Sequence, residues 1–528
     1  MENRAKVALF LIVFLLIQSL PWVSIGAPAF VYLSVYGDRL EFVLNSDGGY
    51  TLWKVKQSVV KNGMTYIFNY EELTIPSKYN GKPVTKIGDK AFQNFKNLKS
   101  IDLPKTITEL GAHVFEGCTS LTEITLPDSI TTIGNGAFAE CTNLKIINLP
   151  SSLKSIGNSA FSGCSKLENI SLPNGLESIG DAAFSECINL KNISLPNGLQ
   201  KIGKEAFYKC TSLTELFIPD SVSKIGAQLC LLCYNLKTVS LPSNLKVIPN
   251  EAFKDTDLEH IVIPEGVTKI GSSAFAYTNF KNIDIPSSVK TIGDYAFAGT
   301  NLEEVTIPDT VVNVGAYLFK GCRNLKEVTL PDHLKSINTN IFENCINLNT
   351  VHYSNDIKRI IDGAFRNTAI KEFIAPNTLE GIGEYAFADC KYLETVILNE
   401  GLKKVPYYAF SYCKSLTTLI LPDSLTEIGS DAFRDCSSLT EVILPDALTL
   451  IGFSSFSYCS SLQYIEIGNN VVEIENYAFN GCTSLTEIRF RGTVEEWNAI
   501  EKENHWNMGM PACKVICTNG EILIDSYQ

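Results

Sequence analysis

A short pattern with Phe at its centre repeats along most of this 528-residue chain. Successive copies follow one another at 22- or 23-residue intervals, and there are eighteen of them. The central positions are Phe92, Phe115, Phe138, Phe161, Phe184, Phe207, Cys230, Phe253, Phe275, Phe297, Phe319, Phe342, Phe365, Phe387, Phe410, Phe433, Phe456 and Phe479. One copy of this length cannot bury its apolar side chains alone, but stacked copies form a continuous core. The chain is therefore expected to fold as one solenoid rather than as several globular domains.

The copy around Phe138 shows what each position contributes. Its alternating segment sends Ile124 inward and Thr125 outward, as in a strand. Pro127 ends that strand because it has no N–H to donate. Gly134 allows a sharp turn, and Phe138 fills the interior at the corner. The pattern predicts about 18 coils, each with a short strand in a parallel sheet on the concave face and a one-turn helical corner.

A second repeated position lies three residues after the central one, and it holds Cys in thirteen copies and Thr in four. The cysteines are Cys118, Cys141, Cys164, Cys187, Cys210, Cys233, Cys322, Cys345, Cys390, Cys413, Cys436, Cys459 and Cys482. Thr256, Thr278, Thr300 and Thr368 each belong to a copy that begins a 22-residue interval. This coupling indicates a tight, buried turn whose side chain packs beside backbone groups or hydrogen-bonds them.

Sixteen cysteines would ordinarily indicate disulfides if a chain is exported, and stacked coils bring neighbouring cysteines close together. The uninterrupted runs in this row contain six, two and five cysteines, however, so the last run leaves one unpaired. We therefore expect free, buried thiols. Cys513 and Cys517 lie outside the row. Three alternatives stay open for them: a local disulfide, free thiols, or part of a metal site with His505.

The start of the chain has the features of a signal peptide. Arg4 and Lys6 precede an apolar run over 7–20, and a small-residue site ends at Gly26. Because about 20 residues are needed to span a bilayer, an uncleaved anchor is the less favoured alternative. We expect no transmembrane segment in the mature chain.

The segments that flank the repeats are expected to cover the two ends of the stack. Segments 50–53 and 66–70 are typical of hairpin strands. Trp497 and Trp506 can hide the apolar end of the last coil. The predicted boundaries are 1–26 for the signal peptide, 27–74 for an N-terminal cap with a β-hairpin, 75–490 for the solenoid and 491–528 for a C-terminal cap.

Composition and spacing argue against several kinds of function. A net charge of -13 without a basic stripe argues against nucleic acid and anionic lipid as partners. The five histidines fall in different copies, and their spacing indicates neither a metal site nor a base beside a nucleophile. Glycines recur because the Ile-Gly pair recurs, so they are turn positions rather than phosphate-binding loops. We predict that the chain is not an enzyme and has no catalytic, metal or cofactor-binding residues.

Two segments match the acceptor pattern for N-glycosylation, Asn169-Ile-Ser171 and Asn192-Ile-Ser194. Both fall in predicted strands. They matter only in a host that glycosylates exported chains, and coincidence with the repeat is the favoured interpretation.

The repeat resembles that of the BspA-like leucine-rich repeat surface proteins, Leu-x-x-Ile-x-Ile-Pro-x-Ser-Val-x-x-Ile-Gly-x-x-Ala-Phe-x-x-Cys. The resemblance covers Ile75 to about Phe490, and the tail from Gly492 onward is similar to the closing segment of that family. It implies an α/β leucine-rich repeat solenoid, capped at both ends. It also implies a secreted or cell-surface protein for adhesion or recognition, with extracellular or host-surface proteins as partners.

Two other functions compete with recognition. A passive structural or self-associating surface-coat protein is the alternative, and an enzyme is the weakest hypothesis. An enzyme would need a site in one of the flanking segments, and each has about forty residues, which is too few for an independent core.

Exposed positions decide what a repeat scaffold binds. The outward residue of each predicted strand belongs to one column of mostly small, polar side chains. This column also holds Phe217, His352 and four isoleucines on consecutive copies, while Tyr464 lies one copy beyond in the flanking column. The isoleucines are Ile374, Ile397, Ile420 and Ile443. These seven residues are the candidate partner-binding set, since apolar stripes rimmed by polar groups mark interfaces.

Structural explanations compete with that interpretation. β-Branched residues favour strands whatever their function, or the C-terminal segment could fold back over the isoleucines. For His352, a solvated polar side chain is the favoured interpretation, because the sequence identifies no partner for it.

Overall fold

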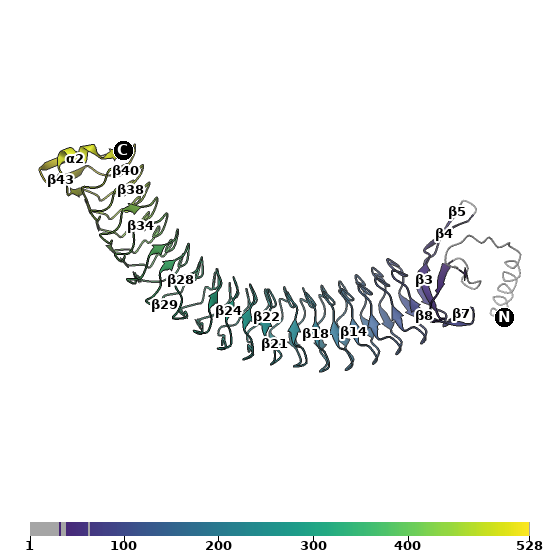
Figure 1. The fold of residues 1–528 in the computed structure, drawn as a ribbon. Coiled ribbons are helices and arrows are strands. Elements are labelled where there is room, and N and C mark those ends of the chain that lie inside the picture. The colour runs from purple at the N-terminus through teal and green to yellow at the C-terminus, as the bar shows by residue number, and fades with distance from the viewer. Residues whose placement is uncertain (1–30, 33–38, 62–63, 527–528) are drawn as a thin grey trace. The chain divides into compact units, whose positions relative to one another are not determined.

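The computed structural model describes residues 31–32, 39–61 and 64–526. The predicted signal peptide, 1–26, lies outside the described residues. The chain divides into two compact units, Met1–Leu236 and Lys237–Gln528, and each contains a stack of short coils (Figure 1). The predicted solenoid with parallel sheets is confirmed, and it has about 19 turns.

Each regular coil contributes two short strands and one corner. A three-residue strand such as β11 (Glu123–Thr125) belongs to what we call the first ladder, and a two-residue strand such as β12 (Thr132–Ile133) belongs to the second ladder. Each strand runs parallel to the equivalent strand of the next coil, so that Ile124 pairs with Ile147. Equivalent residues of successive coils therefore lie side by side.

In both units, each regular coil contributes first a strand of the first ladder and then a strand of the second ladder. In the first unit, the first ladder contains β6 (Glu72–Thr74), β9 (Ser100–Asp102), β11, β13 (Ile146–Asn148), β15 (Asn169–Ser171), β17 (Asn192–Ser194) and β19 (Glu215–Phe217). Its second ladder contains β8 (Lys82–Ile87), β10 (Glu109–Leu110), β12, β14 (Ser155–Ile156), β16 (Ser178–Ile179), β18 (Lys201–Ile202) and β20 (Lys224–Ile225).

The second unit continues both series. Its first ladder contains β21 (Thr238–Ser240), β25 (Glu304–Thr306), β27 (Glu327–Thr329), β29 (Thr350–His352), β31 (Glu372–Ile374), β33 (Thr395–Ile397), β35 (Thr418–Ile420), β37 (Glu441–Ile443), β39 (Tyr464–Ile467) and β41 (Glu487–Phe490). Its second ladder contains β22 (Val247–Ile248), β23 (Lys269–Ile270), β24 (Thr291–Ile292), β26 (Asn313–Val314), β28 (Ser336–Ile337), β30 (Arg359–Ile360), β32 (Gly381–Ile382), β34 (Lys404–Val405), β36 (Glu427–Ile428), β38 (Leu450–Ile451), β40 (Glu473–Ile474) and β42 (Glu501–Lys502).

The corner of each coil is a turn, so the predicted one-turn helix is wrong. In one corner, the N–H groups of Gly136, Phe138 and Glu140 donate to carbonyls of the next coil at 2.7–2.8 Å. The N–H groups between them bond three residues back, and Gly136 and Glu140 have φ angles of 60° and 57°. An α-helix would keep all of these bonds within one segment. Among the described residues, α2 (Val494–Ala499) is the only α-helix, so the fold is a β-solenoid with almost no helix rather than an α/β repeat.

The central Phe side chains form the spine of the core. Phe161 is fully buried and stacks on Phe138 and Phe184 of the neighbouring coils, with ring centroids 5.5 and 5.3 Å apart. The planes of these pairs differ by 3° and 9°. Because the coils lie in register, each added coil extends this stack and buries one more ring.

The Cys and Thr positions make different hydrogen bonds in the buried turn. The Cys164 thiol donates to the Phe138 carbonyl of the preceding coil at 3.1 Å. The Thr300 hydroxyl donates to the Phe297 carbonyl of its own coil at 2.9 Å. The predicted buried turn with side-chain to backbone bonding is therefore confirmed. Cys connects two coils at this position, whereas Thr closes the turn within one.

All sixteen cysteines are buried free thiols in the structure. Cys513 and Cys517 lie on one strand, β43 (Cys513–Cys517), with β44 (Gly520–Ile524) beside it. Residues four apart on a strand are separated by about 13 Å, while a disulfide needs Cα atoms within about 7 Å. The strand geometry therefore excludes the local disulfide.

Paired strands and aromatic rings lie at the start of the first unit. β2 (Leu40–Leu44) and β3 (Tyr50–Val55) are antiparallel, and β3 continues the second ladder by pairing with β8. Phe42 stacks on Tyr79 at 4.6 Å, and Tyr50 meets Tyr79 edge-on. The remaining strands here are β1 (Val31–Tyr32), which pairs with β2, β4 (Ser58–Lys61) with β5 (Met64–Ile67), and β7 (Lys78–Tyr79).

The C-terminal segment contains a further coil that the count of central Phe residues missed. The N–H groups of Phe479 and Gly481 donate to the carbonyls of Trp506 and Met508 at 2.9 Å, as a corner does toward the next coil. Asn507 occupies the central position, and the interval from Phe479 is longer than usual because α2 is inserted between the two coils. Because the central residue is Asn instead of Phe and the interval is longer than 23 residues, the repeat count from the sequence did not include this nineteenth coil.

Replacing Phe161 by Ala should remove one ring from the middle of the spine and leave a cavity. We expect the free energy of unfolding to fall by about 3–5 kcal/mol, as for other buried Phe residues. Chemical denaturation followed by circular dichroism would measure the change. As a control, Phe217→Ala should shift the value by less than about 0.5 kcal/mol, because Phe217 is exposed. Equal effects of the two substitutions would contradict the proposed spine.

The thiol row should make the fold sensitive to alkaline pH. Burial raises the pKa of Cys118, Cys187 and Cys459 to about 12, against about 8.5 in an unfolded chain. Between these values the unfolded chain loses protons that the folded chain keeps, so stability is lost as pH rises. At pH 10 the loss is about 2 kcal/mol for each such thiol. Denaturation midpoints under reducing conditions at pH 8 and pH 10 would show it.

The triple variant Cys118→Ala, Cys187→Ala and Cys459→Ala is the control for this effect. It should be less stable at pH 8 but lose less stability between pH 8 and pH 10 than the natural chain does. The same pH dependence in both proteins would show that groups other than these thiols are responsible.

Candidate functional site

The first ladder exposes two columns of side chains. On β11, Ile124 is buried while Glu123 and Thr125 on either side of it are exposed. The same alternation recurs on most strands of the ladder. The outward column predicted from the sequence therefore lies on the surface.

Three of the four predicted isoleucines lie in register on neighbouring strands. Ile374 on β31 pairs with Ile397 on β33, which pairs with Ile420 on β35. Ile374 and Ile420 are 56% and 51% exposed, and Ile397 between them is half-buried. The hydrogen-bonded sheet ends at β35, and Ile443 lies on β37, in the next sheet. We call Ile374, Ile397 and Ile420 the isoleucine stripe.

Polar groups flank the isoleucine stripe. Glu372 and Thr418 are exposed in the second outward column of the same strands. Tyr464 on β39 pairs with Glu441 of β37, and the guanidinium of Arg489 lies 4.5 Å from the centre of its ring. One face of the Tyr464 ring is therefore already in contact with a cation of this chain.

His352 has a partner that the sequence did not identify. Its Nε2 atom lies 2.9 Å from Oε1 of Glu327, which is on the preceding strand. Both side chains are more than half exposed, so this contact contributes little to stability. Phe217 is 53% exposed on β19 of the first unit. His352 thus lies on β29, the first-ladder strand that precedes β31 of the isoleucine stripe, whereas Phe217 belongs to the first unit.

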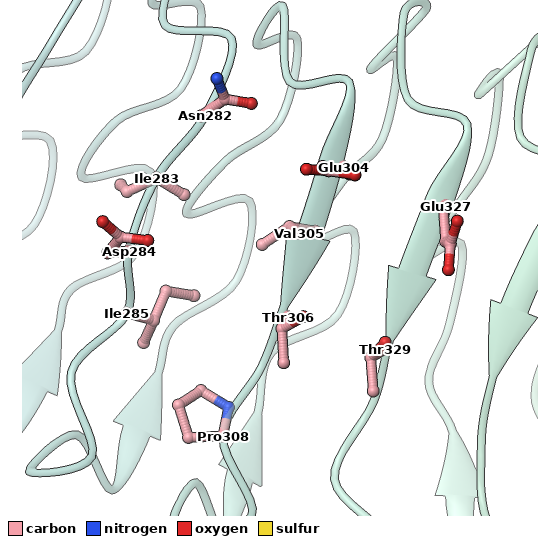
Figure 2. A pocket seen from close by; sticks show the side chains of 10 residues that line it. All are labelled: Asn282, Ile283, Asp284, Ile285, Glu304, Val305, Thr306, Pro308, Glu327 and Thr329. Atoms are coloured by element: carbon pink, nitrogen blue, oxygen red, sulfur yellow. The ribbon is translucent and has the colours of Figure 1, made fainter.

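A shallow hollow on the first-ladder face of the second unit was not predicted. Figure 2 shows Asp284, Glu304 and Glu327 around it, with the side chains of Thr306 and Thr329 on neighbouring coils. Residues 279–285 form no strand, and the coil before them has only an isolated bridge at His260, although the earlier coils supply a strand at this position. The signal for this irregularity was the series of 22-residue intervals that begin at Thr256, Thr278 and Thr300.

The hollow lacks the features of a metal site. Across the described ranges, no group of three or more His, Cys, Asp or Glu side chains is placed to hold a metal ion. The histidines contact separate partners: His113 lies 2.9 Å from Glu116, His352 contacts Glu327, and His505 packs against Tyr477. The alternative of a metal site at Cys513 and Cys517 therefore has no support among the described residues.

Both candidate glycosylation segments lie in strands, as their sequence predicts. Asn169 on β15 pairs in register with Asn192 on β17, and both side chains are exposed. No helix in the described part of the chain is long and apolar enough to cross a membrane.

Comparison with known proteins identifies the repeat. A family model described as BspA type leucine rich repeat region matches 60–171, 154–280, 268–394 and 382–500, which together span most of the chain. None of the curated proteins compared with the chain matches it.

Several solved structures are similar along most of the chain. A leucine-rich repeat protein from Bacteroides ovatus is 26% identical, with 90% of this chain and 98% of that one covered and a TM-score of 0.36. A leucine rich cell surface protein from Faecalibacterium prausnitzii is 23% identical, with 91% and 99% covered and a TM-score of 0.30. The pneumococcal vaccine antigen PcpA is 18% identical, with 94% and 100% covered and a TM-score of 0.31.

Proposed function

Because this chain belongs to the family of BspA type leucine-rich repeat proteins, we propose that it is a secreted or cell-surface protein that binds other proteins. Leucine-rich repeat proteins generally mediate protein interactions, and they are a non-enzymatic kind of protein. The partners that we propose are extracellular or host-surface proteins, and the role is adhesion or recognition.

The isoleucine stripe is the proposed binding site. Its three side chains are apolar, lie on one sheet and are flanked by polar residues such as Glu372 and Thr418. Exposed apolar groups with a polar rim are typical of protein interfaces. Since ladder hydrogen bonds fix the strands, a partner would meet a surface that needs little ordering, which lowers the entropic cost of binding.

Other residues of the outward columns can add contact area around the isoleucine stripe. A standard interface uses about 800 Å² on each partner, which is more than three side chains provide. We propose that Ile443, Tyr464 and His352 extend the contact along the same ladder of the second unit, and that Phe217 forms a separate contact on the first unit.

Export is proposed from the sequence of residues 1–26. A basic start, an apolar run over 7–20 and a small-residue site are the three parts of a secretory signal. Two glycosylation segments on exposed strand positions are compatible with an exported chain.

Replacing Ile374 and Ile420 by Ser should weaken binding at least tenfold. Ser occupies the equivalent outward position at Ser171, Ser194 and Ser240, so the fold should tolerate it. The chain from Ala27 would first be screened against immobilised matrix and cell-surface proteins. Dissociation constants for the captured protein would then be measured by surface plasmon resonance.

The control for this experiment is Val262→Ser, which removes an apolar side chain that is 82% exposed in the same column but outside the stripe. It should leave the dissociation constant unchanged. Binding that is equally tight in all three proteins would remove the isoleucine stripe from the proposal. Light scattering of the natural chain would reveal self-association, and a concentration-dependent oligomer that the Ile374→Ser and Ile420→Ser changes abolish would instead support a coat protein.

Export should depend on the segment 1–26. When the full chain is expressed in an export-competent bacterial host, we expect a product outside the cytoplasm that begins at Ala27, because the small residues before it suit a signal peptidase. N-terminal sequencing and intact mass would identify that end. A chain without residues 2–26 should stay in the cytoplasm, and an exported product that still carries Met1 would contradict the assignment.

A further inference from the structure

Two positions in each corner of the coils have a left-handed backbone. They lie two residues before and two residues after the central Phe, and most coils place Gly, Asn, Ser, Asp or Glu there. In the second unit, eight of these positions hold Tyr with φ between 54° and 61°. They are Tyr277, Tyr295, Tyr317, Tyr385, Tyr408, Tyr412, Tyr458 and Tyr477. The described left-handed positions of the first unit hold no Tyr.

This backbone conformation is unfavourable for a bulky side chain, which makes a set of eight tyrosines unusual. Conformational strain of this kind persists where surrounding structure enforces it, and it is concentrated at functional positions. The six corners from Gly383 to Met510 contain most of these residues. We call Tyr385, Tyr407, Tyr408, Tyr412, Tyr458 and Tyr477 the tyrosine corner.

Three rings of the tyrosine corner contact one another, and a fourth contacts a neighbouring Phe. Tyr385 stacks on Tyr408 at 5.0 Å and meets Tyr407 edge-on at 5.4 Å, and Tyr407 and Tyr408 are 4.2 Å apart. Further along, Tyr477 meets Phe453 edge-on at 5.7 Å. Tyr407 and Tyr458 remain 37% and 47% exposed. Tyr385, Tyr407 and Tyr408 are therefore ordered by one another, and Tyr407 and Tyr458 are accessible to a partner.

Acidic side chains occur in the same corners as these rings. The six corners 383–390, 406–413, 429–436, 452–459, 475–482 and 503–510 contain six carboxylates, and Arg434 is their only Arg or Lys. The carboxylates are Glu384, Asp389, Asp431, Asp435, Glu475 and Glu503. Arg366 and Lys414, from outside these segments, pair with Asp389 and Asp435. Carboxylates thus outnumber the cations that reach them, by six to three.

The chain itself shows how this surface holds a cation. Arg434 places one guanidinium nitrogen 3.0 Å from Asp431, and its guanidinium carbon lies 5.5 Å from the centre of the Tyr458 ring. Arg366 repeats the arrangement, 3.3 Å from Asp389 and 5.5 Å from the ring centre of Tyr385. In both cases an aromatic face and a carboxylate hold one guanidinium. Cation–π attraction and ion pairing both favour a positive partner at such a place.

We propose that the tyrosine corner is a second binding face, and that it takes a segment of a partner protein that carries exposed Arg or Lys side chains. Tyr and Arg dominate the binding energy of protein interfaces, and rigid Tyr side chains supply contact area at a low cost in conformational entropy. The negative surroundings exclude an anionic partner and attract a basic one. This face differs from the isoleucine stripe, so the inference goes beyond the proposed function and does not depend on it.

Other coils of this chain show which residues can replace Tyr at the left-handed positions in a binding test. Ser occupies the left-handed position before the central residue at Ser159, Ser273 and Ser454, and Asn occupies the position after it at Asn94, Asn344 and Asn367. The corner variant is therefore Tyr408→Ser, Tyr412→Asn and Tyr458→Asn. The control variant is Tyr317→Ser and Tyr277→Asn, which makes the same changes outside the tyrosine corner.

Fluorescence anisotropy with labelled twelve-residue peptides would test the proposal on the chain from Ala27. One peptide alternates Arg with Ser and Gly, a second has Lys for Arg, and a third has Glu. We expect the Arg peptide to bind most tightly, because its planar group stacks on rings. The Glu peptide should not bind. The corner variant should bind the Arg peptide at least tenfold more weakly, and the control variant and Ile374→Ser with Ile420→Ser should match the natural chain.

Circular dichroism and denaturation midpoints would establish that the corner variant is folded. Equal affinity of the corner variant and the natural chain for the Arg peptide would overturn the proposal, since attraction would then come from net charge alone. Binding of a neutral oligosaccharide such as cellohexaose through the same tyrosines, without binding of the Arg peptide, would overturn the assignment to a basic protein segment. If Ile374→Ser with Ile420→Ser leaves partner binding unchanged while the corner variant loses affinity for the Arg peptide, the tyrosine corner is supported as a binding face and the isoleucine stripe is not.

Discussion

The hydrogen bond from one coil to the next is the interaction on which the rest of this structure depends. In the corners, N–H groups donate to carbonyls of the following coil, whereas N–H groups along the second ladder, such as those of Lys154 and Gly157, donate to carbonyls of the preceding coil. Each residue therefore lies beside its equivalent about one repeat away. This register brings Phe onto Phe and places each thiol of the thirteen-membered Cys row beside a Phe carbonyl of the coil before it. The buried chemistry repeats because the backbone register repeats.

The same register turns surface positions into columns. A side chain that would be isolated on a globular protein has its equivalents on both sides, and a few substitutions create a stripe or a cluster. The isoleucine stripe arises in this way on the first ladder, and the tyrosine corner arises at the left-handed positions of the corners. Substitution at these outward positions leaves the core unchanged, so one scaffold can carry two faces with different chemistry.

Irregularities in the repeat have local consequences for the same reason. The run of 22-residue intervals that begins at Thr256 coincides with the missing strand at 279–285 and with the hollow around Asp284. The longer interval before Asn507 accommodates α2 and ends in a coil with Asn instead of Phe at the central position. Since each coil contacts only its neighbours, such a change is absorbed within one or two coils.

The sequence by itself determined the solenoid, the length of its repeat, the buried Phe and Cys rows and the outward column, because stacking is one-dimensional and its period is visible in the chain. Only the tertiary structure decided that the corners are turns, since half of their N–H groups bond to the next coil, a choice that the pattern does not encode. It also decided which outward residues meet: Ile374, Ile397 and Ile420 share a sheet that Ile443 does not, and His352 contacts Glu327. The tyrosine corner could not be predicted from the sequence either, because left-handed φ angles and the contacts between rings and guanidinium groups depend on how neighbouring coils pack.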